Sequence, residues 1–397
     1  MQSADPEHFF ETDASQAQRQ RKAAKADNKN GDPLSMKSKI LAAISDPASP
    51  LTSVFVAGSA GFVRRVNLES SETKSTYRGP KAPVTCIAIG GQGNKTLFAG
   101  SWDKDIWSWD IDSASPKRKF SGHADFVKTV VCAKISGKDI LISGGADKKI
   151  LVWDIESGRR IHTLQDPSTT MLAVQYLAVD PVLSTSNAVV VVSASSDPHL
   201  RRWKITLESS EQVLESFHDR PETERLTIQE HETSIYRLVF DDTNDDADLW
   251  TASADGTAKC LSRSRNFVTE DSFEHGDYVR AVAMTDQWVI TAGRNEDVKV
   301  WDRSSGKLYA TLVGHYEEIT DLVMLRDAGG IGRKVCSVGI DGTIRTWPLG
   351  KSEIDEVVIK IEEAAKPKAK EEEKGVSQLT AEEEAELAEL MGDDDDD

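Results

Sequence analysis

Histidine, serine and aspartate residues recur together along this chain of 397 residues, and these are the residue types of a hydrolytic triad. Two sets are complete, and each ends in a tryptophan: His123, Ser143, Asp147 and Trp153, and His315, Ser337, Asp341 and Trp347. In both sets the serine stands four residues before the aspartate and the tryptophan six residues after it. Because neither set stands apart from this repeated pattern, the spacing favours a structural hydrogen-bond network over a catalytic or metal-binding site.

Trp-Asp pairs set the period of the pattern. They are Trp109-Asp110, Trp153-Asp154 and Trp301-Asp302. Weaker copies keep the six-residue spacing, with Asp197 before Trp203, Asp255 before Leu261 and a degenerate copy at Ala60 before Val66. Continuous apolar runs at residues 140–142 and 189–192 are typical of strands buried on both faces. A unit repeated about every forty residues predicts a β-propeller or another repeat array.

The pattern resembles the WD-repeat family over most of residues 37–361. Gly122-His123 and Gly314-His315 supply the Gly-His pair of the family's repeat, and Ser/Thr, Asp and Trp-Asp follow. The resemblance implies an all-β, seven-bladed β-propeller with four short strands in each blade. It also implies that the His, Ser, Asp and Trp of each complete copy form a hydrogen-bonded chain inside one blade. Such a chain is physically sensible, because a buried Asp or His is costly unless it is hydrogen bonded.

Composition divides the chain into three segments. Residues 1–36 are a polar, partly basic arm that we expect to be disordered, residues 37–361 form the propeller, and residues 362–397 form an acidic tail. In the tail, Thr380 followed by Glu383 is a capping box, which predicts a short helix over residues 380–391. The outer strand of the last blade comes either from residues 357–361 or from an N-terminal segment.

Negative charge is concentrated at the C-terminal end. From Gly350 onward the chain has 18 Asp and Glu residues and 6 Lys residues, a net charge of −12, whereas the whole chain carries −18. Nucleic acid is therefore a poor default partner, because phosphate contacts need clustered Lys and Arg. The tail is interpreted as a solubilising, disordered segment. The alternative is an arm, from Glu382 to Asp397, that holds a basic client.

Other sequence features point away from membranes, metals and catalysis. No long apolar run and no signal-peptide core are present, so we expect an intracellular protein of the cytoplasm or nucleus. The cysteines show no C-x-x-C spacing and are expected to be reduced core residues in different blades: Cys86, Cys132, Cys260 and Cys336. We expect no catalytic, cofactor-binding or metal-binding residues, and a propeller hydrolase remains the open enzyme class.

The resemblance places partner contacts on one propeller face, beside the turn aspartates and at the starts of the inner strands. Carried over copy by copy, the candidate protein-binding residues combine aromatic rings with cations: Trp102, Phe126, Lys128, Tyr236, Tyr278, Arg280 and Arg294. Aromatic and arginine side chains commonly anchor protein interfaces. Packing between blades is the alternative for Phe126 and Tyr278. Such a rim on an acidic chain favours a peptide that carries acidic and apolar groups.

Three functions follow from this reading. The first is a monomeric scaffold or adaptor that gathers other proteins into a complex. The second is an escort for a basic client, such as a ribosomal protein or a histone, that uses the acidic tail. The third is a substrate receptor of a ubiquitin ligase. It is weakened because such receptors commonly carry Trp-Asp-x-Arg, whereas the copies here read Trp-Asp-Ile-Asp, Trp-Asp-Ile-Glu and Trp-Asp-Arg-Ser.

Overall fold

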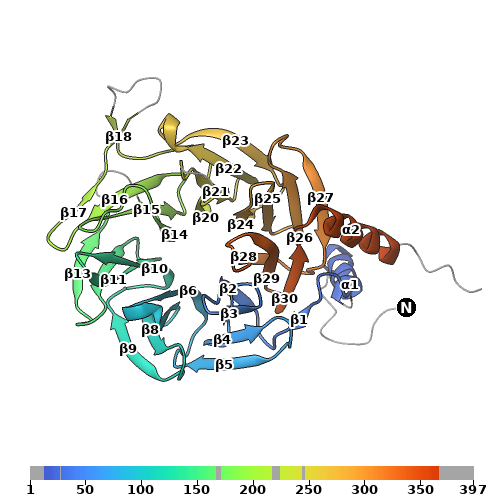
Figure 1. Cartoon of the computed structure of the whole chain (residues 1–397), viewed down its shortest axis with the longest axis horizontal. Coiled ribbons are helices and arrows are strands. Elements are labelled where there is room, and N and C mark those ends of the chain that lie inside the picture. The colour runs from blue at the N-terminus through green and yellow to red at the C-terminus, as the bar shows by residue number, and fades with distance from the viewer. Residues whose placement is uncertain (1–12, 27, 167–170, 217–223, 244–245, 366–397) are drawn as a thin grey trace, which may run out of the picture. The chain divides into compact units, whose positions relative to one another are not determined.

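Seven four-stranded antiparallel sheets are arranged about one axis, as Figure 1 shows for the computed structural model. The structure describes residues 13–26, 28–166, 171–216, 224–243 and 246–365. Within these residues the sheets form a seven-bladed β-propeller, so the predicted fold class is confirmed. In each of blades 1 to 6 the four strands follow one another in the sequence from the inside of the ring to the outside.

The strands of the seven blades have the following bounds. Blade 1 contains β2 (Ile40–Ser45), β3 (Ser53–Gly58), β4 (Phe62–Asn67) and β5 (Thr73–Arg78), and blade 2 contains β6 (Val84–Gly90), β7 (Thr96–Ser101), β8 (Asp105–Asp110) and β9 (Pro116–Ser121). Blade 3 contains β10 (Val127–Ile135), β11 (Lys138–Gly145), β12 (Ile150–Asp154) and β13 (Arg160–Leu164), and blade 4 contains β14 (Val174–Val179), β15 (Val189–Ser195), β16 (Leu200–Ile205) and β17 (Ser210–Gln212). Blade 5 contains β20 (Ile235–Phe240), β21 (Leu249–Ser253), β22 (Thr257–Ser262) and β23 (Val268–Glu274), and blade 6 contains β24 (Val279–Met284), β25 (Trp288–Gly293), β26 (Asp297–Asp302) and β27 (Leu308–Val313). Blade 7 contains β28 (Ile319–Arg326), β29 (Gly332–Gly339), β30 (Thr343–Pro348) and β1 (Leu34–Ser35).

Burial follows the position of a strand within its blade. The second strand of each blade has a strand on each side and a neighbouring blade on each face. One example is β15, which is buried along its whole length. An outer strand has one free edge, and β9 exposes five of its six residues and buries only Phe120. The inner strands contact one another in succession around the ring, and β28 contacts β2. The apolar runs at residues 140–142 and 189–192 lie in the buried strands β11 and β15.

The N-terminal segment closes the ring. Strand β1 pairs antiparallel with β30, with Leu34 opposite Ile344 and Ser35 opposite Thr343. Residues 357–361, the alternative source of this strand, lie instead in helix α2 (Lys351–Ala365). Their β-branched residues suggested a strand, but Ile354, Val358 and Ile361 recur at helical spacing. The last blade therefore ends at Pro348, and the predicted propeller boundary at residue 361 is too late.

The described part of the N-terminal arm is more ordered than its composition predicts. Residues Asp13–Ala26 form helix α1. Lys22 pairs with Glu317 at 2.6 Å, and Lys25 pairs with Glu296 at 2.9 Å. These acidic partners belong to the loops of blades 6 and 7 and supply contacts that a composition argument cannot include. The helix predicted over residues 380–391 lies outside the described residues.

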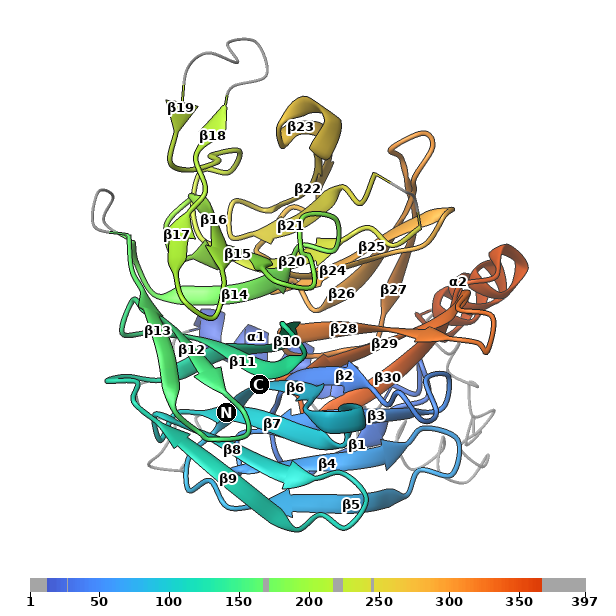
Figure 2. The same ribbon diagram turned by 60° about the vertical axis from the view of Figure 1, so that its left-hand side comes forward.

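Smaller elements connect the blades. Between blades 4 and 5, β18 (Glu215–Ser216) and β19 (Glu224–Arg225) form a hairpin that projects from the ring in Figure 2. Single 3-10 turns occur at Gln92–Asn94 and Arg263–Arg265. The described residues up to Val358 form one compact unit, and those from Ile359 to Ala365 belong to a second. No helix in the described ranges is long and apolar enough to cross a membrane.

Candidate functional site

The histidine-containing sets form hydrogen-bonded chains inside blades 3 and 7. In blade 3, Trp153 Nε1 donates to Ser143 Oγ at 2.9 Å, and Ser143 lies 2.8 Å from His123 Nε2. The other ring nitrogen of His123 lies 3.0 Å from the carboxylate of Asp147. Blade 7 repeats the chain with the following residues: Trp347, Ser337, His315 and Asp341. Every polar group is paired within a blade, which is the arrangement of a scaffold.

The other blades carry variants of this chain. Blade 5 keeps His231 between Thr251 and Asp255 but has Leu261 where blade 3 has tryptophan. Blade 4 has no equivalent histidine among its described residues, and Arg201 there pairs with the buried Asp166 and with Asp197. These substitutions explain why blades 4 and 5 form weak copies of the sequence pattern.

Blade 6 replaces the carboxylate with an amide, and this makes its histidine sensitive to acid. His275 lies 2.7 Å from Asn295 Oδ1 and 2.8 Å from Thr291 Oγ1. Burial, with a smaller contribution from the charge of Lys299, lowers the pKa of His275 to about 4, although the hydrogen bond that His275 donates to Asn295 Oδ1 acts in the opposite direction. The folded protein therefore holds a neutral imidazole, whereas the unfolded chain binds a proton near pH 6.5.

We expect acid to destabilise the protein partly through His275. Its contribution to stability is fully present above about pH 6.5 and is lost as the pH falls toward 4, because the unfolded chain then binds the proton more tightly. Between pH 7 and pH 5 this amounts to about 2 kcal/mol. Denaturant unfolding at the two pH values measures it. Asn295→Asp restores the carboxylate found in blades 3, 5 and 7 and should flatten the pH dependence. An unchanged slope in Asn295→Asp would exclude His275 as the source.

A repeated backbone hydrogen bond builds one end of the propeller. In all seven blades, the N–H of the residue after the second strand donates to the carbonyl of the residue before the inner strand. Trp102 donates to Pro83 at 2.9 Å and Arg294 to Tyr278 at 3.0 Å. We call this end, with its turns between second and third strands and the residues that lead into the inner strands, the BC face. In every blade this hydrogen bond brings together the two kinds of position predicted to contact a partner: those beside the turn residue and those at the start of the inner strand.

Aromatic rings are exposed on the BC face. Trp102 of blade 2 stacks on Phe126, which precedes β10 of blade 3, with ring centroids 4.9 Å apart and an interplanar angle of 14°. Trp102 is 40% exposed, Phe126 37% and Tyr278 41%, so all three rings are open to solvent, although the stack of Phe126 on Trp102 also joins blades 2 and 3. The guanidinium of Arg294 lies 5.1 Å from the ring centroid of Tyr278. Because stacking already holds the rings in place, little conformational entropy is lost when a partner binds to them.

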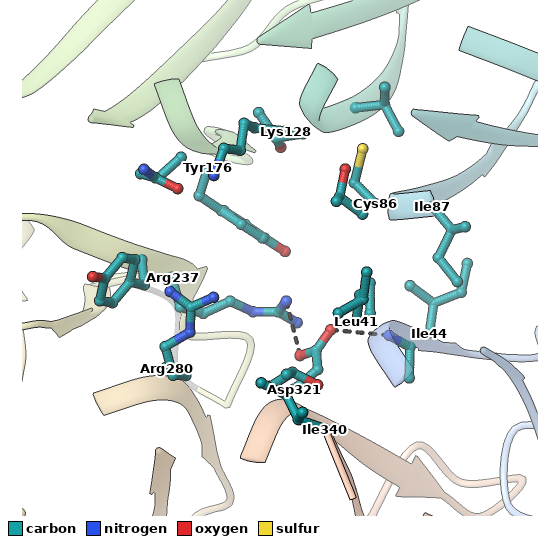
Figure 3. A pocket seen from close by; sticks show the side chains of 18 of the residues that line it. Leu41, Ile44, Cys86, Ile87, Lys128, Tyr176, Arg237, Arg280, Asp321 and Ile340 are labelled. Carbon is teal, nitrogen blue, oxygen red and sulfur yellow. Dashed lines mark hydrogen bonds and ion pairs between the residues drawn. The ribbon is translucent and has the colours of Figure 1, made fainter. Parts of the chain in front are cut away.

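A cavity of about 220 Å³ lies at the BC-face end of the channel. All seven inner strands or the residues just before them line it, and Trp102 and Ile340 contribute from the turns. Figure 3 shows that Lys128, Tyr176, Arg237, Arg280 and Asp321 converge on this space. We call it the mouth cavity. With Trp102 it includes Lys128, Tyr236 and Arg280, so four of the predicted protein-binding residues line it.

Ion pairs and cation–π contacts order the charged residues of the mouth cavity. Arg237 pairs with Asp321 at 2.9 Å, and its guanidinium lies 4.7 Å from the ring centroid of Tyr176. Burial alone would lower the pKa of Arg237, but the charges of Asp321 and Tyr176 and the hydrogen bond to Asp321 together outweigh burial and raise it. Asp321 also accepts hydrogen bonds from two backbone N–H groups. These bonds hold the pair in a fixed geometry.

A second arginine is held in the same way at the rim. Arg280 lies 4.1 Å from the ring centroid of Tyr236 and pairs with Glu318 at 2.9 Å. Lys128 is half-buried nearby, where burial and then the charge of Arg280 lower its pKa.

Sequence reasoning missed the deeper members of this site, Tyr176, Arg237 and Asp321. A detectable signal exists for two of them, because Arg237 and Asp321 each interrupt an otherwise apolar inner strand. A charge in such a strand must face a counter-charge or the channel. No residue that lines the mouth cavity is a histidine.

The cysteines form no disulfide with one another, and the described residues form no metal site. Three cysteines are buried and Cys132 is half-buried, and all four are free thiols. Burial raises the pKa of Cys86 and of Cys132 to about 12. Within the described ranges, no group of three His, Cys, Asp or Glu residues is placed to hold a metal ion.

Two family models match this chain. The WD40 domain of the tRNA methyltransferase TRM82 matches residues 117–234, and the WD domain, G-beta repeat matches residues 71–110. Among curated relatives, an uncharacterized WD repeat-containing protein of Schizosaccharomyces pombe is 29% identical over 99% of this chain and 100% of its own length. The nuclear distribution protein nudF of Aspergillus niger is 24% identical. The match covers 72% of this chain and 63% of the length of nudF.

Both family models and the Schizosaccharomyces pombe relative carry the WD repeat in their names. The Schizosaccharomyces pombe protein matches along the whole chain, whereas the nudF match leaves part of both proteins uncovered. The two family models, the Schizosaccharomyces pombe relative and the seven blades thus all support the WD-repeat β-propeller family that the repeat pattern resembles.

Proposed function

We propose that the chain is an adaptor that recruits a partner protein to its BC face, within a complex of the cytoplasm or nucleus. WD-repeat propellers generally mediate protein interactions, and this fold usually serves as a scaffold without catalysis. The observation that carries the proposal is the exposed stack of Trp102 on Phe126 beside a charged cavity. Exposed aromatic rings next to arginines are the typical energetic centre of a protein interface.

The BC face offers a partner more than one place to bind. The Trp102–Phe126 stack and the Tyr278–Arg294 pair come from blades on different sides of the ring, and the mouth cavity lies on the same face. An extended segment laid over the BC face could meet both pairs. Such a segment would supply apolar side chains for the rings and acidic groups for the cations.

The proposal is tested by affinity purification with mass spectrometry from the native cell. The double substitution Trp102→Ala/Arg294→Glu should remove a defined set of partners, with at least about a tenfold loss of recovery, because hot-spot truncation typically costs more than 1 kcal/mol. Ile331→Ala/Arg333→Glu changes an exposed apolar residue just before β29 and an exposed arginine at the start of β29, at the opposite end of the blade, and should leave recovery unchanged. Equal recovery with both double variants contradicts the proposal.

The acidic tail supports a second candidate, an escort for a basic client. Its observation is the net charge of −12 from Gly350 onward. A variant that ends at Val376 removes the segment from Glu382 to Asp397 and should lose basic clients, such as a ribosomal protein or a histone, while it keeps BC-face partners. Loss of partners only in this variant would favour the escort over the adaptor.

A further inference from the structure

The mouth cavity contains three cations and two carboxylates. Arg237 faces Asp321 and Arg280 faces Glu318, each pair with an N–O distance of 2.9 Å. Lys128 is the third cation, and no carboxylate of the described residues lies within ion-pair distance of its Nζ. With all five groups ionised, the cavity has one positive charge in excess.

This excess charge is partly withdrawn from water. Lys128 is half-buried, and its pKa is lowered by burial and then by the charge of Arg280. A partly buried ammonium beside another cation is unfavourable unless an anion is brought to it. The energy of the free protein would therefore fall if a ligand supplied one negative charge at this position.

Arg280 is also open to a better-aligned acceptor. Its Nε lies 2.9 Å from Glu318 Oε1, yet this contact lacks hydrogen-bond alignment and leaves the buried Nε–H without an acceptor among the described residues. The buried Nε–H of Arg237 likewise has no acceptor among the described residues. Charged hydrogen bonds need good alignment to reach their full strength, so an entering carboxylate can compete with Glu318 for Arg280.

We propose that the mouth cavity receives one carboxylate side chain of a partner peptide, held between Lys128 and Arg280, while a neighbouring apolar side chain of the same peptide packs on the Trp102–Phe126 stack. Trp102 and Lys128 line the same cavity, so both contacts are within reach of one short segment. One carboxylate balances the excess charge, whereas a phosphate dianion would leave a surplus negative charge next to Glu318 and Asp321. The inference rests on the proposed function and names the chemistry that the BC face recognises.

Two matched peptide pools test the proposal on the full-length chain. Both are acetylated and amidated nonapeptides with apolar residues at random flanking positions. One pool has a central glutamate and the other a central glutamine. We expect the glutamate pool to be enriched on the protein. Its best member, measured by fluorescence anisotropy, should bind at least about tenfold more tightly than its glutamine twin. Equal binding of the twins overturns the proposal.

Substitutions on a single strand locate the carboxylate. Lys128→Met should remove the preference for glutamate, whereas Lys134→Met, at the exposed far end of β10, should keep it. A third twin of the best peptide carries a central lysine. Lys128→Glu should prefer this lysine twin, and the gain of binding shows that the variant is folded. Retention of the glutamate preference in Lys128→Met contradicts the proposed position.

The same variants separate this inference from the proposed function. If Trp102→Ala/Arg294→Glu removes cellular partners while Lys128→Met keeps them all, the BC face is an interface and the carboxylate site is refuted. If neither variant loses partners, both proposals fail.

Discussion

Removal of residues 1–36 should lower the free energy of unfolding by on the order of 3 to 5 kcal/mol, because it strips the counter-groups from a buried charge and opens the ring. Arg345 is fully buried, and its Nη1 donates to Asn28 Oδ1 at 2.9 Å and to the carbonyl of Asn30. Asn28 and Asn30 in turn donate to the carbonyls of Gly314 and Val313, at the end of the outer strand of blade 6. Without the segment, Arg345 loses these partners and β30 becomes an unpaired edge.

Two truncations separate ring closure from the contacts of α1. A variant that begins at residue 28 keeps Asn28, Asn30 and β1, and loses α1 with its ion pairs to Glu317 and Glu296. Because those lysines are partly exposed, this truncation should cost less than about 1 kcal/mol. A variant that begins at residue 37 should show the large loss. Urea denaturation monitored by tryptophan fluorescence compares them, and equal stabilities would mean that β1 does not hold the ring closed.

Asp147→Ala should destabilise the protein by on the order of 3 kcal/mol. Its carboxylate lies 3.0 Å from His123 Nδ1 and accepts the backbone N–H of Ala124 at 2.9 Å. Burial alone would raise the pKa of Asp147, but hydrogen bonds from His123 and the backbone outweigh it and keep the pKa below its usual value. Its removal leaves the donors of His123 and Ala124 without an acceptor in a turn that fixes the register of blade 3.

The control for Asp147→Ala is Asp154→Ala in the same blade. Asp154 is the aspartate of a Trp-Asp pair, and its carboxylate accepts the N–H of Ser157 in an exposed turn. The loss of this bond should cost only about 0.5 kcal/mol. Thermal melts of the two variants give the comparison, and similar melting temperatures would show that the blade network does not stabilise the fold.

Some residues of the candidate interface could be predicted from the spacing of the repeat, and others could not. Trp102, Phe126, Tyr278 and Arg294 were selected because the repeat fixes their offset from a turn residue. A backbone hydrogen bond present in all seven blades brings these offsets to one face. Arg237 and Asp321 were missed because their pairing joins blades 5 and 7, whose inner strands are neighbours only across the channel. A repeat pattern reports positions within one blade and carries no information on contacts across the ring.

The sequence by itself determined the repeat, the number of blades and the residues of the two complete hydrogen-bonded chains. These are local properties, since a buried turn with His, Asp, Ser and Trp needs the same spacing in every copy. Only the tertiary structure decided how the ring closes and which charges share the mouth cavity. An N-terminal segment and residues 357–361 were both plausible sources of the outer strand, and the choice of residues 34–35 depends on Asn28 and Asn30 meeting Arg345 of blade 7. Such long-range pairing follows from packing the whole ring, so no short segment of the sequence encodes it.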